Sequence, residues 1–322
     1  MDFSRTAYRL LTSAALVLPL TAMAFPDKPI EWVVPYAAGG GSDVVARVLA
    51  EAMGKTLGQT MIVNNKPGAA TNIGADYVAK AKADGHVVLT ADTATLAANP
   101  ALYSKLSYSA EKDFAPVGLM ARFPLVLVVN AAVPVNNLPE FLAWAKKQPG
   151  GVNYATPGAG SPHHLATELF RSQSGLQLVH VPYRGAAPAV QDVVGGQVPF
   201  MFVDTASGYP HILSGKLRPV GIASAKRVAA FDTVPTLAEQ GLKGFEAYAW
   251  QGMVVPVATP PAAVAALSKA LLAALDTTAV KARFQTLGLE AIPGTPAQMS
   301  AYAKSEREKW AQVIRASNIH LD

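Results

Sequence analysis

Residues 30–57 read IEWVVPYAAGGGSDVVARVLAEAMGKTL, and this stretch decides the fold. The β-branched and aromatic run Ile30–Tyr36 predicts a strand, and the glycines Gly39–Gly41 predict a tight loop. Apolar residues at helical spacing then predict a helix over Asp43–Leu57. A strand, a glycine loop and a helix in this order begin an α/β unit whose next strand lies parallel to the first.

The alternation of strand-like and helix-like segments continues and restarts near the middle of the chain. Strands are predicted at Met61–Asn64, His86–Ala91, Leu125–Asn130, Val152–Ala155, Leu178–Tyr183, Pro199–Val203, Val220–Ala223 and Phe245–Val255. The predicted helices are Ile73–Ala83, Leu138–Lys147, Pro162–Ser174, Ala187–Val194, Ser207–Ser214, Pro261–Leu275, Ala279–Leu287 and Pro296–Ser317. We therefore expect an α/β fold with mostly parallel sheets that helices cover on both faces.

The last three predicted helices have no clear strand between them, so we expect them to pack on the sheet of the first block. This arrangement gives a discontinuous first lobe, residues 25–121 and 248–322, and an inserted second lobe, residues 122–247. The chain crosses between the lobes twice, near Leu119–Pro124 and Ala247–Gly252, and two crossings make a hinge. Two doubly wound lobes joined in this way are the type II periplasmic binding-protein architecture.

The first 24 residues indicate export. Arg5 and Arg9 precede the apolar run Leu10–Leu20, and Ala22-Met23-Ala24 has the small–x–small pattern of a cleavage site. We expect residues 1–24 to be a cleaved signal peptide and the mature chain to be a soluble monomer in the periplasm.

Composition excludes several classes of function. The 322 residues contain no cysteine, which excludes a thiol nucleophile and thiolate metal ligands, and the formal net charge is +5. The basic residues are scattered without a stripe of interleaved aromatics, so we expect no nucleic-acid binding. We expect no cofactor. We also expect no metal, because adjacent helical residues such as His163 and His164 diverge by about 100° and cannot easily bind one ion together.

The glycine loop after the first strand is the strongest candidate for a binding site. Glycines let backbone N–H groups approach a ligand, and the start of the following helix favours an anion. The loop lacks the spacing of a dinucleotide fingerprint and the Gly-Lys-Ser/Thr of a P-loop, and we expect Asp43 to cap the helix. The candidate ligand-binding residues here are Tyr36, Ala38, Gly39, Gly40, Gly41, Ser42 and Asp43.

A second loop of the same design follows the strand Val152–Ala155. Ser161 lies at a predicted N-cap and Pro162 at the first helical position. Two such loops on opposite lobes are expected to face each other across the cleft. The candidate residues here are Thr156, Gly158, Gly160, Ser161 and His164.

Other candidates follow the ends of predicted strands, where a parallel sheet presents its ligand-facing loops. They are Thr93, Thr95, Tyr183, Arg184 and Asp204. Arg184 could contact a carboxylate or form a surface salt bridge. Asp204 could cap the next helix, hold an amino or hydroxyl group, or repel an anion. Trp250 could line the cleft or pack in the hinge.

Ordered motifs from about Phe25 to the C-terminus resemble the solute receptors of the tripartite tricarboxylate transporter family, often called Bug-type receptors. They are Phe25–Ile30, Pro35–Asp43, Asn64–Ala69, Asn99–Tyr103, Gly158–His164, Val181–Gly185, Ser214–Arg218 and Val234–Glu239. The segment Ala91–Ala97 departs from the family, whose members often carry a Ser/Thr-rich stretch ending in His-Ala. Asp92 there would favour a solute with an amine, or a less charged one.

The resemblance implies a two-lobed receptor without catalytic activity. Loops like Tyr36–Ser42 and Thr156–His164 hold carboxylates in this family through backbone amides, hydroxyls and bridging waters. The implied ligand is a small mono- or dicarboxylate, and the implied partner is a membrane permease of two subunits. Two alternatives remain at this point: an exported serine-dependent hydrolase, although Gly-x-Ser-x-Gly is absent, and a periplasmic sensor receptor that presents the loaded form to a signalling partner.

Overall fold

The structure is a computed structural model that describes residues 25–321, so the predicted signal peptide lies outside the described residues. The strands are β1 (Ile30–Val34), β2 (Met61–Asn65), β3 (Val87–Asp92), β4 (Phe114–Asn130), β5 (Val152–Thr156), β6 (Leu178–Pro182), β7 (Phe200–Asp204), β8 (Leu217–Ile222), β9 (Tyr248–Pro256) and β10 (Glu290–Gly294). The α-helices are α1 (Gly41–Leu57), α2 (Asn72–Ala79), α3 (Asn99–Leu102), α4 (Leu138–Ala145), α5 (Pro162–Ser174), α6 (Ala186–Val194), α7 (Thr205–Leu213), α8 (Pro261–Asp276), α9 (Thr278–Thr286) and α10 (Pro296–Ala316). Three short turns lie between them: η1 (Ala69–Thr71), η2 (Thr93–Ala98), which is π-helical, and η3 (Ala229–Phe231).

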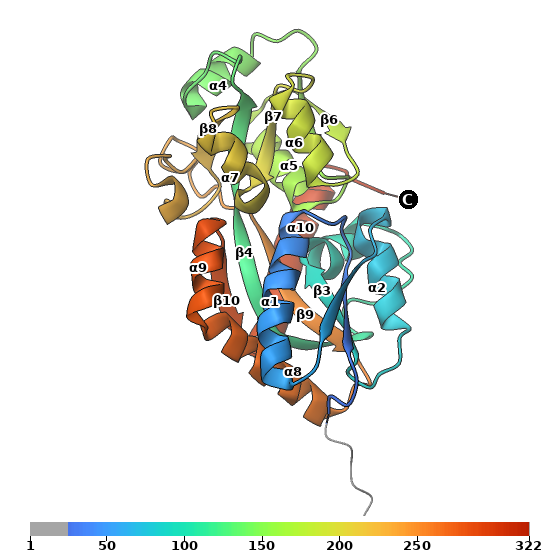
Figure 1. The fold of residues 1–322 in the computed structure, drawn as a ribbon. Coiled ribbons are helices and arrows are strands. Elements are labelled where there is room, and N and C mark those ends of the chain that lie inside the picture. The colour runs from blue at the N-terminus through green and yellow to red at the C-terminus, as the bar shows by residue number, and fades with distance from the viewer. Residues whose placement is uncertain (1–24, 322) are drawn as a thin grey trace, which may run out of the picture.

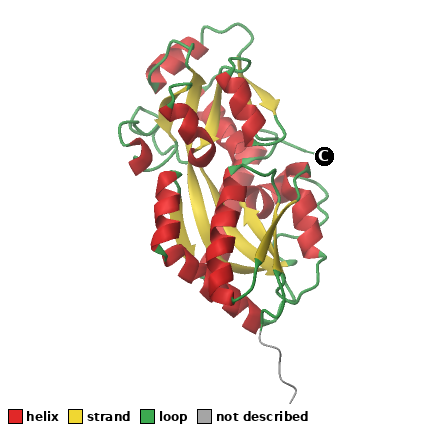
Figure 2. Cartoon of the chain, viewed as in Figure 1, coloured by secondary structure: helices red, strands yellow, loops and turns green. Residues whose placement is uncertain are grey.

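Both faces of β1 are buried, because helices cover the sheet on both sides (Figure 2). Ile30, Trp32 and Val34 belong to one apolar cluster with residues of α1 and α8, and Val33 belongs to another, with residues of α2 and α10. A strand covered on both faces reads as an unbroken apolar run rather than as an alternating one. This burial of β1 between helix layers agrees with the α/β class predicted from residues 30–57.

The strand order is β2-β1-β3-β9-β4-β7-β5-β6, and β8 and β10 also pair with β4. β4 is 17 residues long. Its first part, Phe114–Pro124, pairs with β9, and its second part, Leu125–Asn130, pairs with β7 and β8. Figure 1 shows β4 running from the lower to the upper part of the molecule. We call β1–β3, β9 and β10 with α1–α3 and α8–α10 the lower half, and β5–β8 with α4–α7 the upper half.

The prediction of mostly parallel sheets is wrong at the centre of the molecule. β1 is parallel to β2 and β3, and β5 is parallel to β6 and β7, as the α/β units require. β9, however, is antiparallel to β3 and β4, and β4 is antiparallel to β7, β8 and β10. The reason is that β4 carries the chain from the lower to the upper half and β9 brings it back alongside.

The terminal segment contains one strand that was not predicted from the sequence. β10 lies between α9 and α10 and pairs with β4, with an irregular register near its Pro-Gly end. Such a short strand ending in Pro-Gly gives little periodic signal. α8 and α10 nevertheless pack on β4 in the lower half, as predicted. Within residues 25–321 no single helix is long and apolar enough to cross a membrane, although α8 and α9 together pass that test across a 66° bend.

The upper half repeats the two-sided packing of the lower half. Phe200 and Phe202 of β7 pack on one face with the aromatic rings of α4 and α5. Met201 and Val203 pack on the other face with α6. Alternate residues of one strand therefore serve two separate cores, which holds β7 firmly between helix layers.

The two halves also touch outside β4 and β9. Thr205 Oγ1 donates a hydrogen bond of 2.8 Å to Gly288 O. A Cβ on Gly41 would lie 2.9 Å from Phe123 Cε1 and 3.0 Å from Asp204 Oδ1, so a larger residue there would require these side chains to shift. The first glycine loop of the lower half is thus in close contact with the upper half.

Three aromatic rings stack behind the second glycine loop. The rings of His164 and His180 are 4.0 Å apart at 10°, and Tyr154 lies 5.0 Å from His180 at 20°. Burial lowers the pKa of His164 to about 4. Burial, together with the neighbouring His164, lowers the pKa of His180 to about 3. Both rings are therefore neutral at neutral pH.

We expect the free energy of unfolding to fall as the pH drops from about 6.5 toward the folded-state pKa values of His164 and His180. In the unfolded chain both histidines regain an ordinary pKa of about 6.5 and take up protons that the folded pair refuses. Urea unfolding at a series of pH values between 7 and 4.5 measures the loss. Replacing His180 with Phe keeps a stacked ring and should flatten the profile, and an equal slope in both proteins would contradict this account.

Candidate functional site

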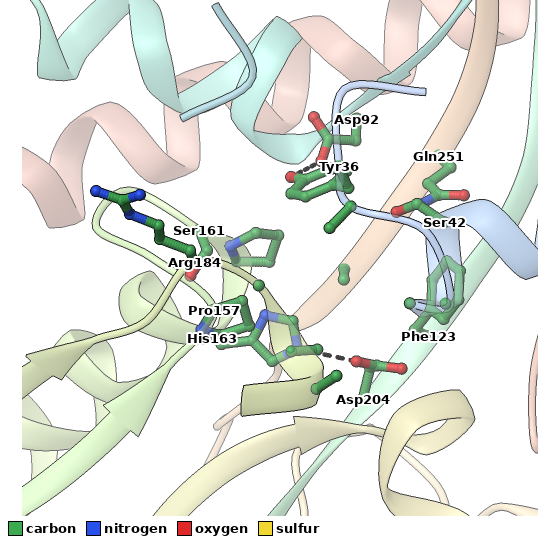
Figure 3. A pocket seen from close by; sticks show the side chains of 18 of the residues that line it. Tyr36, Ser42, Asp92, Phe123, Pro157, Ser161, His163, Arg184, Asp204 and Gln251 are labelled. Carbon is green, nitrogen blue, oxygen red and sulfur yellow. Dashed lines mark hydrogen bonds and ion pairs between the residues drawn. The ribbon is translucent and has the colours of Figure 1, made fainter. Parts of the chain in front are cut away.

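A cavity lies between the halves, at the carboxyl ends of β1, β5 and β7 (Figure 3). It contains about 680 Å³ of space not filled by protein atoms, part of which is open to solvent. The lower half contributes Tyr36, Ala37, Ala38, Gly40, Gly41, Ser42, Asp92, Ala249, Trp250 and Gln251; the upper half contributes Pro157, Ser161, Pro162, His163, Arg184, Gly185, Ala186, Ala187, Pro188 and Asp204; Phe123 of β4 lies between them.

The first glycine loop presents free backbone donors to this cavity. Helix α1 begins at Gly41, two residues before the predicted start, and its N-cap is Gly40 without a side-chain cap. The first backbone hydrogen bond of the helix runs from Val44 N to Gly40 O. Within residues 25–321 the N–H groups of Gly40, Gly41 and Ser42 therefore have no acceptor. Unpaired N–H groups at the positive end of a helix favour an anion.

Asp43 does not cap the helix as predicted and does not line the cavity. Its carboxylate turns back to accept hydrogen bonds from Gly39 N, Arg47 Nε and Asn65 Nδ2, each of 3.0 Å. Burial raises the pKa of Asp43, but the bonds from Arg47, Gly39 and Asn65 outweigh it, so the pKa lies below its ordinary value. Because the helix starts at Gly41, Asp43 falls inside the first turn, where it holds the loop rather than a ligand.

Asp92 lies in the segment that departs from the family pattern, and both of its carboxylate oxygens accept hydrogen bonds from other residues of the protein. Its Oδ2 accepts a short hydrogen bond from the Tyr36 hydroxyl, and its Oδ1 accepts from Thr95 N and Thr95 Oγ1 at 2.9 Å each. Burial raises the pKa of Asp92, although the bonds from Thr95 and Tyr36 oppose the shift. The carboxylate therefore positions Tyr36 at the start of the loop and is not a free site for an amine.

Gln251 holds the other end of the same loop. Its Nε2 donates a short hydrogen bond to Ser42 Oγ. Asp92 and Gln251 are register partners in the antiparallel pair β3–β9. Two facing residues of neighbouring strands thus fix Tyr36 and Ser42, and the glycine amides between them stay free.

In the second glycine loop, Ser161 caps the following helix as predicted. The histidine that lines the cavity, however, is His163 and not the predicted His164. Ser161 is the N-cap of α5, and its Oγ accepts a 3.3 Å hydrogen bond from His164 N. His164 points into the aromatic stack, and its Nδ1 accepts from Gly160 N at 3.1 Å. His163, one residue earlier, lines the cavity instead. The helical rotation of about 100° per residue separates the two rings.

Asp204 caps α7 and also meets His163. Its Oδ1 accepts from Ser207 N at 2.9 Å, and its Oδ2 lies 3.3 Å from His163 Nε2. Burial raises the pKa of Asp204, but the bonds from His163 and Ser207 outweigh it, so the pKa lies below its ordinary value. Asp204 is therefore a buried, ionised wall residue of the cavity.

Arg184 lies at the rim, in the loop between β6 and α6. Its side chain is exposed and makes no ion pair or hydrogen bond within residues 25–321. Figure 3 shows its guanidinium pointing away from the other labelled side chains of the cavity. A second cavity adjoins the first at Tyr36, Pro157 and Arg184, and Gly158 and Tyr183 line only this second one.

The structure brings together only part of the predicted set. Eight predicted residues line the main cavity: Tyr36, Ala38, Gly40, Gly41, Ser42, Ser161, Arg184 and Asp204. Seven line neither of the adjoining cavities: Gly39, Asp43, Thr93, Thr95, Thr156, Gly160 and His164. Phe123, His163 and Gln251 also line the cavity, although the sequence did not predict them as site residues. Phe123 and Gln251 lie in the two predicted crossings between the lobes. Their place in those crossings was the one sequence signal that could have indicated a position in the cleft.

The serines of the two glycine loops, Ser42 and Ser161, are the candidate nucleophiles for the hydrolase alternative, and they do not form a catalytic arrangement. Within residues 25–321, neither Ser42 nor Ser161 makes a hydrogen bond to a histidine ring: Ser42 pairs with Gln251, and Ser161 accepts from a backbone amide. A nucleophilic serine needs such a base within reach. Among the same residues there is no cluster of three or more His, Asp or Glu that could hold a metal ion.

A family model and several solved structures are similar to this chain. Residues 45–319 match the tripartite tricarboxylate transporter family receptor. The chain is 35% identical to the periplasmic binding protein BugD, with a TM-score of 0.87 over 92% of this chain and 99% of that one. It is 31% identical to an R. palustris protein solved with adipate, with a TM-score of 0.89 over 92% and 99% of the chains. It is 34% identical to MatC from Rhodopseudomonas palustris with bound malate, with a TM-score of 0.85 over 90% and 100%.

These similarities confirm the periplasmic binding-protein fold and the Bug-type resemblance inferred from the motifs. The homologues are solute-binding receptors, which removes the hydrolase alternative. The chain belongs to the tripartite tricarboxylate transporter receptor family, a family of periplasmic solute-binding proteins.

Proposed function

We propose that this protein captures a small organic acid in the cavity between its halves. The observation that carries the proposal is the row of unpaired N–H groups at Gly40, Gly41 and Ser42, at the start of α1. A hydrogen bond to a charged oxygen contributes roughly 1.5–3 kcal/mol. Three such bonds, together with burial of the ligand's carbon skeleton, support micromolar binding, which corresponds to about −8 kcal/mol.

The neighbours narrow the class of ligand. The similar proteins solved with adipate and with malate hold small aliphatic dicarboxylates. The walls of this cavity combine the polar glycine loop with Phe123 and prolines such as Pro157 and Pro162. We infer a ligand with a carboxylate at the α1 end and an apolar carbon skeleton against these walls.

The closing motion that we propose uses the two crossings. We propose that the lower half belongs to one lobe, residues 25–121 and 248–322, and the upper half to a second lobe, residues 122–247. β4 and β9 carry the chain across both times, so bending of this strand pair would open and close the cavity as a hinge. We further propose that the chain acts as a monomer in the periplasm and delivers its ligand to a two-subunit membrane permease.

Purified mature protein should be stabilised by small carboxylates. A ligand at about 100 times its Kd adds ~2.7 kcal/mol, which raises the Tm of a chain of this size by roughly 5 °C. A thermal-shift screen with malate, adipate, succinate and benzoate, followed by calorimetry on the hits, measures this.

The matched controls of the screen are the amides of the same acids, diamides for the dicarboxylates and the monoamide for benzoate, together with sugars. These compounds keep the size of the ligand but lack the anionic oxygen that the loop amides would bind. Stabilisation by the amides or sugars and not by any acid would overturn the proposed function.

Replacing Gly41 with Ala should weaken acid binding by about tenfold or more, because crowding of this kind costs ~1–3 kcal/mol. The added methyl would lie 2.9 Å from Phe123 Cε1 and 3.0 Å from Asp204 Oδ1, so it would oppose closure of the halves. Calorimetric titration with the best acid measures the loss.

Gly40→Ala is the matched control in the same loop. Its Cβ would meet only Ala37 O, at 3.8 Å, and its φ of −80° suits any residue. We expect a clearly smaller loss of affinity than for Gly41→Ala. Equal losses in the two variants would show that crowding at Phe123 and Asp204 does not govern binding.

A further inference from the structure

The segment that follows α10 turns sharply at Asn318. The helix ends at Ala316, and Asn318 has a φ of 50°, in the left-handed region. Asn318 N donates a hydrogen bond of 3.2 Å to Arg315 O, and Ile319 N donates one of 3.1 Å to Ile314 O. Such a pair of bonds is a common end of a helix, and asparagine tolerates the left-handed backbone better than most residues. The sequence of this turn therefore sets the direction of residues 319–321.

Leu321 lies between the two halves. Its N–H donates a hydrogen bond of 3.0 Å to Leu102 O, and both leucines belong to one apolar cluster of the lower half. The two side chains also lie against Gly160 of the second glycine loop, in the upper half. A Cβ on Gly160 would be 2.9 Å from Leu321 Cδ1 and 2.8 Å from Leu102 Cδ1. Leu321 thus brings the segment after α10 into contact with the second glycine loop.

Leu321 also lines the second cavity, the one that adjoins the main cavity. The residue is half-buried, so part of its surface is left for a ligand. Tyr36 and Ala37 of the first glycine loop and Pro157 of the second line both cavities. The two spaces therefore meet where the glycine loops of the two halves come together.

The walls of the second cavity favour an apolar group. Prolines and alanines predominate among the lining residues: Pro35, Pro67, Ala69, Ala70, Ala94 and Ala159. The hydroxyl of Tyr183, another wall residue, is already used in a 2.7 Å hydrogen bond to Asp192 Oδ2. Among the described residues that line this cavity, Arg184 is the one charged residue, and it lies at the rim. Burial of hydrocarbon against such walls raises affinity by roughly fourfold for each CH₂ group.

Part of this wall has a strained backbone. Ala69, Ala70 and Thr71 line the second cavity with φ values of 45°, 49° and 79°, which residues other than glycine rarely adopt. Asn99 Nδ2 donates a hydrogen bond of 2.7 Å to Ala70 O. Thr95 Oγ1 donates one of 3.0 Å to Thr71 Oγ1. Strained backbone that the surrounding structure holds in place is concentrated at ligand-binding sites.

We propose that the end of the ligand far from its carboxylate enters the second cavity, and that Leu321 determines how large this end can be. The inference rests on the proposed function, in which the amides of Gly40, Gly41 and Ser42 hold the carboxylate. It narrows the class of ligand to organic acids whose chain ends in an apolar group such as an aromatic ring. Leu321 is then a specificity-determining residue that the segment after α10 brings to the cleft.

A series of phenyl acids measures how far the ligand reaches. Benzoate, phenylacetate, 3-phenylpropionate and 4-phenylbutyrate share a carboxylate and a ring and differ in the number of CH₂ groups between them. Calorimetric titration of the purified mature protein gives their affinities. We expect the affinity to rise by about tenfold or more from benzoate to the best longer acid, because its ring reaches the second cavity. Affinity that stays level or falls along the series overturns the proposal.

Variants of Leu321 test its role as the residue that sets the size. Leu321→Ala widens the second cavity and Leu321→Phe narrows it. The quantity to compare is the affinity for 4-(2-naphthyl)butyrate divided by that for 4-phenylbutyrate. This ratio should be highest in Leu321→Ala and lowest in Leu321→Phe, with about a threefold change or more at each step. A residue that only stabilised the fold would change both affinities alike, so an unchanged ratio in both variants overturns the assignment.

Ile319→Ala is the matched control in the same segment. Ile319 packs against the same apolar cluster as Leu321 but lines neither cavity. We expect this variant to keep the wild-type ratio. A change as large as that in Leu321→Ala would show a general effect of the segment and overturn the assignment to Leu321.

The outcomes separate the two proposals. Binding of malate or adipate without binding of any phenyl acid overturns this inference and leaves the proposed function standing. Failure of every acid to bind overturns the proposed function, and this inference with it. The wild-type measurements decide both points even where a variant fails to fold.

Discussion

The pairing of β4 with β9 is the constraint on which the rest of the structure depends. The register runs from Phe114 opposite Pro256 to Pro124 opposite Tyr248, and these strands are the two passages between the halves. Their backbone hydrogen bonds keep the two passages side by side, so the chain joins the halves through one pair of strands. Phe123 and Gln251 lie on this pair and line the cavity, so the strands that link the halves also form part of the binding site.

The polar network around the first glycine loop has a direct consequence for binding. Asp92 and Gln251 use their hydrogen bonds on Tyr36 and Ser42, and Asp43 uses its own on Gly39 and Arg47. Side chains therefore hold the ends of the loop, and the backbone donors between them are left for a ligand. A loop held in this way loses little conformational entropy on binding, which favours affinity without a built-in cation.

Sequence reasoning located both loops but not all of their side chains. The Ser161 cap and the cleft position of Gly40–Ser42 followed from turn chemistry, which acts within a few residues. The cap assigned to Asp43 was wrong because Gly40 and Gly41 can enter the helix earlier than a periodic pattern shows. His164 was chosen where His163 lines the cavity, since a shift of one residue rotates a helical side chain by about 100°.

The sequence by itself determined the features that depend on neighbours along the chain: the α/β alternation, the two glycine loops and the family motifs. Only the tertiary structure decided that β9 returns antiparallel beside β4, that Asp92 faces Gln251, and that His163 Nε2 meets Asp204. The physical reason is that register and helical phase are settled by packing between distant segments. A step of one residue turns a strand side chain to the other face, and no local pattern records that choice.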